Sequence, residues 1–163
     1  MEYLKWIENL GLSAWVRESP RIWAFPTILL LHTVGMALCV GINAAIDLRI
    51  LGFAPGIRLA PLERLLPILW LGFWINAITG TLLVMQDATT KLRNPDFYMK
   101  MIFIAIALVI LRMTQKKVFR NGIDDGQLPF NAKVLAALSL FFWLAAITAG
   151  RLLAYVGPVT GLS

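Results

Sequence analysis

Three side chains in the first strongly apolar segment could bind a metal ion. His32, Met36 and Cys39 are spaced at i, i+4 and i+7, so in a helix all three lie on one face. Imidazole with soft sulfur is the ligand set that Cu(I) prefers, whereas zinc would need a further Cys or His to complete a tetrahedral site. Methionine and cysteine are also common fillers of apolar cores. The spacing therefore allows a copper site without requiring one.

His32 is the only histidine of the chain and lies near the middle of this apolar run. An ionisable residue at that depth needs a partner and commonly marks a ligand, metal or proton site. It is about ten residues into its helix, roughly 15 Å deep, which suits an axial ligand of a haem b held between helices. The alternative is a neutral imidazole that bonds to Asn76, Thr79 or a backbone carbonyl across a pair of helices.

One histidine per chain limits how a haem could be ligated. A bis-histidine haem needs two imidazoles, so the haem would be five-coordinate, take a non-histidine ligand, or lie across a dimer interface to which each protomer gives His32. Arg151 and Arg21 are expected on one membrane side, where a guanidinium could bind the haem propionates. Arg151 could instead extend to lipid headgroups or pair with Asp87 or Asp96.

Membrane-spanning helices must position these side chains. The chain has 163 residues, is 59% hydrophobic and has a mean hydropathy of +0.74, which is too apolar for an ordinary soluble domain. A hydrocarbon core of ~30 Å needs roughly 20 apolar residues in a helix. Four segments meet that requirement and predict an all-α four-helix transmembrane bundle in one domain, residues 1–163, with spans at about 22–45, 65–85, 97–113 and 134–156.

Local signals predict where the helices begin and end. Asp47 and Arg49 are expected to end the first span ahead of a turn-rich loop. Residues 89–97 are expected to be a loop, with Asp96 near the start of the next helix. Residues 1–18 are predicted to form an amphipathic helix that lies in the membrane interface.

Small residues predict where two spans approach closely. Gly72, Asn76 and Gly80 lie four apart on one face of the second span, a spacing that lets helix backbones meet and an asparagine bond across. Gly35 and Gly41 on the first span leave a flat surface against which a macrocycle or another helix could pack. The glycines alone do not discriminate between these two occupants.

The distribution of charge predicts the partners and the orientation. The net charge is +6, but the 15 Lys and Arg lie mostly in loops and at helix ends, where they meet lipid phosphates, so nucleic-acid binding is excluded. Eight of the 15 follow the first and third spans, and the other seven include Lys100 and Arg151 within spans. The positive-inside rule therefore favours termini on the periplasmic side of a bacterial inner membrane.

The third span has almost nothing polar between Lys100 and Arg112 and is expected to be mainly structural.

The sequence offers no catalytic machinery. It has no pairing of a nucleophile with a base, no paired intramembrane carboxylates and no glycine-rich phosphate loop, so an acyl-transfer or phosphoryl-transfer enzyme is disfavoured. A single cysteine, Cys39, excludes an internal disulfide.

Segments throughout the chain resemble a family of small, uncharacterised bacterial four-helix membrane proteins. Between Trp15 and Tyr155, the similar stretches are LLHTVGMALCVG, AIDLRILGF, LGFWINAITGTLLVMQDA, NPDFYMKM and ITAGRLLAY. The pattern LHxxGxxxxxG, from Leu31 to Gly41, is more distantly similar to the first helices of cytochrome b561-like and copper-resistance D-type membrane proteins. The first resemblance implies a four-helix membrane fold, and the second implies haem ligation at His32.

Three hypotheses for function follow. The first is an integral membrane b-type haem protein in electron transfer, with the cofactor bound by His32, Asn76, Arg151 and Arg21. The second is a cofactor-free accessory subunit that stabilises a larger membrane complex. The third is a Cu(I)-handling protein with the ligands His32, Met36 and Cys39. In each case the expected partners are membrane lipid and either further copies of the chain or a larger membrane complex.

Overall fold

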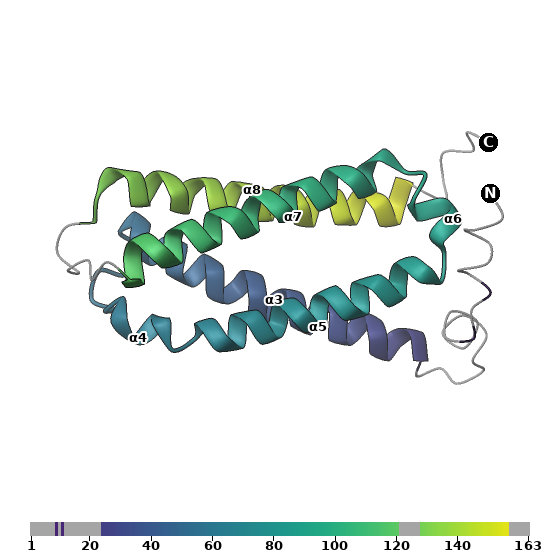
Figure 1. Ribbon diagram of the computed structural model, residues 1–163, viewed down its shortest axis with the longest axis horizontal. Coiled ribbons are helices and arrows are strands. Elements are labelled where there is room, and N and C mark those ends of the chain that lie inside the picture. Colours follow the sequence, from purple (N-terminus) through teal and green to yellow (C-terminus); the bar gives the residue numbers. More distant parts are fainter. Residues whose placement is uncertain (1–8, 10, 12–23, 121–127, 157–163) are drawn as a thin grey trace.

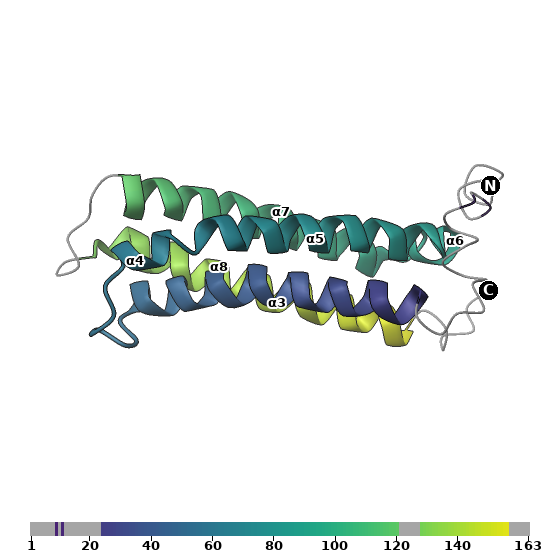
Figure 2. The same ribbon diagram turned by 90° about the horizontal axis from the view of Figure 1, so that it is seen from below.

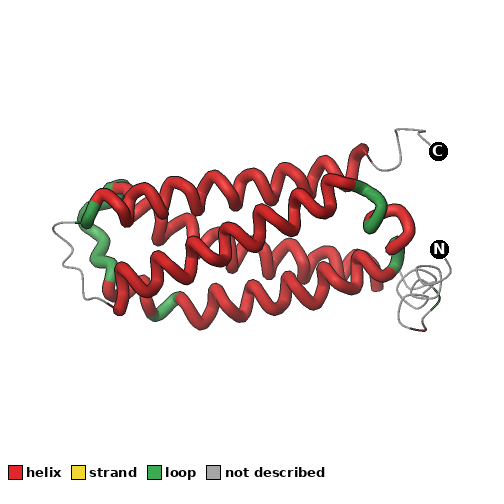
Figure 3. Tube along the Cα trace, turned by 45° about the horizontal axis from the view of Figure 1, so that its top comes forward, coloured by secondary structure: helices red, strands yellow, loops and turns green. Residues whose placement is uncertain are grey.

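The computed structural model describes residues 9, 11, 24–120 and 128–156. Within these ranges the chain is helical and contains no strand (Figure 3). Four long helices dominate, and they are α3 (Ala24–Leu51), α5 (Leu66–Met85), α7 (Pro95–Thr114) and α8 (Phe130–Val156). Two short helices, α4 (Ala60–Glu63) and α6 (Ala88–Lys91), and a π-helical turn, η1 (Gln115–Arg120), complete the described elements. The predicted all-α four-helix bundle is confirmed.

The helical segments are long and apolar enough to cross a membrane. The four candidate spans are Phe25–Leu51, Ala60–Met85, Pro95–Phe119 and Phe130–Leu152. Large apolar side chains cover the outside of the bundle, among them Leu30, Trp74 and Phe141, each about 60% exposed. Such a surface suits hydrocarbon rather than water. The chain is therefore a multi-pass membrane protein.

The four long helices are arranged as two antiparallel pairs (Figures 1 and 2). α3 packs along α5, and α7 packs along α8. A third contact, between α3 and α8, joins the pairs, whereas α5 and α7 make few close backbone contacts on the fourth side. The bundle is thus closed on three sides by tightly packed helices and on the fourth mainly by side chains.

Two groups of buried apolar side chains form the core. One lies in the middle of the bundle and draws on every long helix, with Cys39, Leu69, Ala107, Leu111 and Trp143. The other lies toward the end that carries α4 and comprises Ile46, Ile50, Leu59, Val118, Ala132 and Ala136. Alanines contribute several of the most buried positions, because a small side chain lets neighbouring helix backbones approach closely.

The first long helix extends beyond its predicted end. Asp47 and Arg49 were expected to end it, but both are buried and the helix continues to Leu51. Asp47 bonds within the bundle, and Nε of Arg49 donates to the carbonyl oxygen of Ile57. The helix ends where Gly52 adopts a φ of +104°, a conformation that glycine tolerates, and donates its N–H to the carbonyl oxygen of Arg49 at 3.1 Å.

The connection before α7 is partly helical. Residues 89–97 were predicted to be a loop, but α6 occupies their beginning, and Nζ of Lys91 at its end donates to the carbonyl oxygen of Leu83. The predicted position of Asp96 near the start of α7 is confirmed, since the Asn94 side chain caps the helix and accepts a bond from the Asp96 N–H at 2.9 Å. α7 and α8 both begin a few residues earlier than predicted. The predicted interfacial helix at residues 1–18 falls outside the described residues, apart from Asn9 and Gly11.

Candidate functional site

His32 lies on α3 and turns its ring toward α5. Its Nδ1 lies 3.1 Å from the carbonyl oxygen of Asn76 and 3.1 Å from the hydroxyl oxygen of Thr79. In return, the side-chain amide of Asn76 donates to the carbonyl oxygen of His32 at 2.8 Å. The sequence named both partners as the alternative to a bound haem, and the structure confirms these bonds.

Glycines allow α3 and α5 to come this close. A Cβ added to Gly35 would lie 2.8 Å from the backbone nitrogen of Asn76, and one added to Gly72 would lie 2.7 Å from the Cβ of Leu38. A Cβ on Gly80 would lie 3.0 Å from Cε1 of His32. The close approach predicted for Gly72, Asn76 and Gly80 is thus confirmed, and Gly35 provides the matching surface on α3. Gly41 plays no part in this contact, because a Cβ there would meet nothing within 4 Å.

The bonds at Nδ1 determine how the neutral His32 ring is protonated. A carbonyl oxygen only accepts hydrogen bonds, so Nδ1 must carry the proton when it bonds to Asn76. The Thr79 hydroxyl already donates to the carbonyl oxygen of Ile75 at 2.6 Å, so toward His32 it too acts as an acceptor. Nε2 of the neutral ring therefore carries the lone pair. This is the form in which an imidazole binds a metal.

A lysine from α7 lies near the His32 ring. The positive charge of Lys100 acts on His32, and its side chain is half-buried among the helices. A Cβ added to Gly150 of α8 would lie 3.4 Å from Cε and 3.4 Å from Nζ of Lys100, so this glycine leaves room for the lysine side chain. The sequence did not identify Lys100 as a site residue, because the span that carries it was expected to be mainly structural. Lys100 lies about one turn after the start of the span in an otherwise apolar stretch, and an ionisable residue in such a position could have indicated a site.

A second lysine lies at the same end of the bundle. Lys91 of α6 is half-buried, and its charge acts on Lys100. Burial lowers the pKa of the Lys91 ammonium from its usual 10.5, and the nearby carboxylate of Asp87 opposes that change. His32, Lys91 and Lys100 together form a group of three basic side chains from three helices, which we call the basic cluster. Such a cluster suits a ligand that carries a negative charge.

The two arginines predicted at the cofactor site have different outcomes. Arg151 is exposed on α8, directly after the glycine that accommodates Lys100. Arg21 lies outside the described residues. Among the described residues, Lys100 is a basic side chain whose charge acts on His32.

The proposed copper ligands lie along one helix but in different surroundings. His32 contacts polar groups of α5, whereas Cys39 is 2% exposed in the central apolar core. Seven residues separate them, about 10 Å along the helix axis, and Met36 lies half-buried between them. In the described ranges no group of three His, Cys, Asp or Glu side chains is arranged to hold a metal ion. A copper site formed by His32, Met36 and Cys39 stays a prediction.

A separate polar group lies toward the opposite end of the bundle. The amide nitrogen of Asn43 donates to the Asp47 carboxylate at 2.6 Å and to the Ser139 hydroxyl oxygen at 2.8 Å. All three side chains are at most 1% exposed. We call them the buried triad. The sequence missed it because Asp47 and Ser139 form no local pattern together, although Asn43 and Asp47 at i and i+4 could have been recognised as one helix face.

Thr114 of α7 is a further buried polar residue. It lies one turn before Val118, which belongs to the core cluster toward the end that carries α4. The Thr114 hydroxyl is buried and makes no hydrogen bond within the part of the chain that the structure describes.

Comparisons with known proteins give no further guidance: no protein-family model, no curated protein and no solved structure matches the chain.

Proposed function

We propose that this protein binds a b-type haem in the membrane through Nε2 of His32 and carries single electrons. The observation that supports the proposal is the bonding of Nδ1 to Asn76 and Thr79, which leaves Nε2 for a ligand. Histidines that bind metals commonly use one ring nitrogen in this way, because the second bond fixes the ring and its tautomer. A bound haem would supply one-electron redox chemistry.

The basic cluster suits the carboxylates of a haem. Lys100 is half-buried, and the strongest charge acting on it is that of another cation, Lys91. A propionate would compensate the charge of Lys100 in surroundings where water cannot do so fully. We assign Lys100 to this role, and we retain Arg151 and Arg21 as further candidates on the same side. Asn76 orients the His32 ring and so acts as a positioning residue.

One imidazole per chain implies a five-coordinate haem, a haem with a second ligand other than histidine, or a haem shared between chains. The sequence contains no second histidine, so a bis-histidine haem would lie between two copies, each of which contributes His32. We propose a homo-oligomer, or a subunit of a larger membrane complex, in a bacterial inner membrane, with both termini on the periplasmic side.

An absorbance spectrum of the mildly solubilised protein, oxidised and then reduced with dithionite, tests this function. We expect a Soret band with reduced α and β bands in the wild type and the loss of these bands in His32→Ala. Met36→Leu serves as the matched control, because it changes the same helix face one turn away and should keep the haem. Wild-type protein from haem-sufficient cells that shows no Soret band and takes up no added haem would contradict the proposal.

The same preparations distinguish the copper hypothesis. Copper that is retained by the wild type but lost in both Met36→Leu and Cys39→Ser, without a Soret band, would favour Cu(I) handling. Copper content that is equal in all three proteins would remove this hypothesis.

One observation favours a second function, that of an accessory subunit. The reciprocal bonds give partners to Nδ2 of Asn76 and Nδ1 of His32 without any cofactor, so they could serve only to hold α3 against α5. In that case native membranes would yield the chain in a stable complex with another protein and without haem absorbance. A homogeneous homo-oligomer would count against it.

A further inference from the structure

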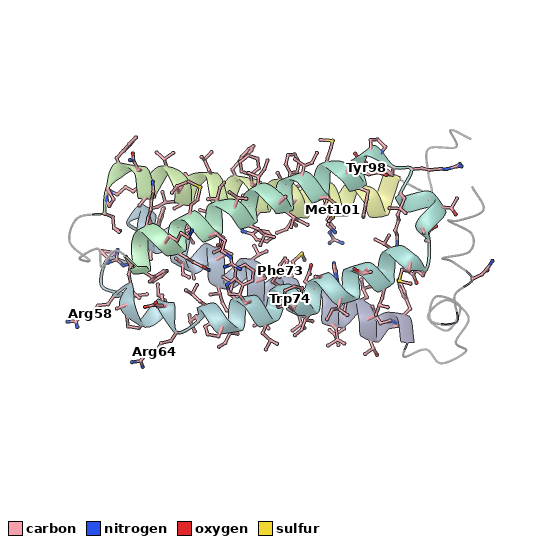
Figure 4. The ribbon with its side chains drawn as sticks, in the orientation of Figure 1. Arg58, Arg64, Phe73, Trp74, Tyr98 and Met101 are labelled. Atoms are coloured by element: carbon pink, nitrogen blue, oxygen red, sulfur yellow. The ribbon has the colours of Figure 1, made fainter. Side chains whose placement is uncertain are left out.

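A groove lies between α5 and α7, on the side of the bundle where these two helices make few close backbone contacts. It has a volume of about 450 Å³, within the range of ligand-binding pockets. Its walls are mainly aromatic and aliphatic, with Trp70, Phe73 and Trp74 on α5 and Leu108 and Val109 on α7. Figure 4 labels Phe73 and Trp74 on α5. Trp74 and Val109 are each 59% exposed, so the groove opens sideways, toward the acyl chains of the bilayer.

Two cations line the same groove. Arg112 and Lys116 lie at i and i+4, so both project from one face of α7 and its continuation η1. The guanidinium carbon of Arg112 lies 4.2 Å from the ring centre of Trp70, a cation–π contact that holds the side chain over the aromatic wall. Within residues 24–120 and 128–156, no carboxylate bonds to either cation. The groove therefore combines an apolar wall with two cations to which no carboxylate of these ranges bonds.

We propose that this groove binds an anionic phospholipid, with the phosphate at Arg112 and Lys116 and an acyl chain along Trp70, Phe73 and Trp74. A lipid is favoured over a soluble anion because the groove lies within two membrane spans and opens toward hydrocarbon. Its cations lie toward the bundle end that carries Arg58 and Arg64, the end that the positive-inside rule gives to the cytoplasm. Anionic lipids attract Lys and Arg side chains at the cytoplasmic membrane surface. The proposal does not depend on haem.

Lipid retention by the purified full-length protein tests the proposal. The protein in mild detergent receives equal amounts of phosphatidylglycerol and phosphatidylcholine, and native mass spectrometry quantifies the lipid that stays bound. We expect the wild type to prefer phosphatidylglycerol, and the double variant Arg112→Gln, Lys116→Gln to bind it roughly 30-fold more weakly, as the loss of two membrane-surface cations predicts.

A matched control removes the same charge from the same end of the bundle. Arg58 and Arg64 are exposed and project away from the helices (Figure 4). The double variant Arg58→Gln, Arg64→Gln should therefore change phosphatidylglycerol binding by no more than about twofold. A second test variant, Val109→Trp, keeps both cations and fills the groove, so it should displace the lipid without a change of charge.

Four outcomes would overturn the proposal. The first is equal loss of phosphatidylglycerol in the Arg112, Lys116 variant and in its control. The second is equal retention of phosphatidylcholine by the wild type, and the third is displacement of the lipid by excess inorganic phosphate. The fourth is a wild-type dimer that Val109→Trp dissociates, since this would assign the groove to a second copy of the chain. For the lipid comparisons, the size-exclusion profile of each variant should match that of the wild type, whereas a change of profile from dimer to monomer in Val109→Trp is itself the fourth outcome.

Discussion

The amide nitrogen of Asn43 lies 2.8 Å from the hydroxyl oxygen of Ser139, a residue 96 positions further along the chain. The same nitrogen donates to the Asp47 carboxylate, so one side chain connects α3 to α8 and compensates a buried acid. Inside the bundle, a polar group that loses its hydrogen-bond partner costs more free energy than the hydrogen bond contributes when it forms.

The buried triad should therefore contribute measurably to stability. Asn43→Leu leaves the Asp47 carboxyl without its amide donor and should lower the free energy of unfolding by about 1–3 kcal/mol. Ser139→Ala removes one bond between helices and should cost about 0.5–1.5 kcal/mol. Thr148→Ala is the control, because that hydroxyl is exposed and bonds only to its own helix at Leu144. Denaturant unfolding in detergent measures the free energy of unfolding of all three variants. Equal losses in Ser139→Ala and Thr148→Ala would contradict a stabilising role of the buried triad.

Two glycines of neighbouring helices should respond oppositely to alanine. A methyl group on Gly72 would lie 2.7 Å from the Cβ of Leu38 and 2.9 Å from the backbone nitrogen of Cys39, so Gly72→Ala should destabilise by about 1–3 kcal/mol. Gly41→Ala meets nothing within 4 Å and should be neutral or stabilise by up to ~1 kcal/mol through helix propensity. Thermal unfolding in detergent compares them. Equal effects would show that α3 and α5 do not meet at Gly72.

Lys100 should influence the reduction potential of a haem at His32. A positive charge nearby favours the reduced iron, so Lys100→Gln should lower the midpoint potential by an amount on the order of tens of millivolts. Lys133→Gln, exposed at the beginning of α8, is the control and should leave the potential unchanged. Redox titration followed in the α band provides the measurement. An unchanged potential in Lys100→Gln would separate Lys100 from the proposed haem site.

Burial of Lys91 predicts a rise of stability at alkaline pH. Burial lowers the pKa of Lys91 in the folded chain, so between that lowered pKa and 10.5 the unfolded chain binds more protons than the folded one. The free energy of unfolding should therefore rise as the pH approaches 10.5 from below. Lys91→Met should reduce this rise, whereas Lys133→Met should keep it. A wild type whose stability falls over the same interval as fast as that of Lys91→Met would contradict the assignment.

Cysteine labelling tests the proposed orientation. In a Cys39→Ser background, Thr90→Cys and Gly56→Cys place one exposed thiol at each end of the bundle. Termini on the periplasmic side predict that an impermeant maleimide labels Thr90→Cys in intact spheroplasts and labels Gly56→Cys only after lysis. The reverse pattern would invert the orientation.

Features that depend on local pattern were predictable from the sequence. The apolar segments predicted four spans, and the Gly72, Asn76 and Gly80 face predicted the contact that His32 uses. Features that depend on partners far away in the sequence could not be predicted. Asp47 was interpreted as a stop signal because an isolated charge favours water, but Asn43 and Ser139 satisfy it inside the bundle.

Lys100 was overlooked for a related reason. A lysine near the beginning of a span is usually placed at the headgroups by its long side chain. Here Gly150 of α8 leaves room for that side chain within the bundle, close to His32 of α3. Neither neighbour is close to Lys100 in sequence, so the composition of the third span alone could not indicate this position.

The contact between α3 and α8 joins residues that are synthesised at different times. Asn43 and Asp47 leave the ribosome well before Ser139, by roughly 5–20 seconds at the usual rates of synthesis. During that interval Asn43 lacks the Ser139 hydroxyl as a partner, and polar side chains at this depth are costly in lipid alone. The stability of α3 in the membrane therefore depends on a helix that is made later.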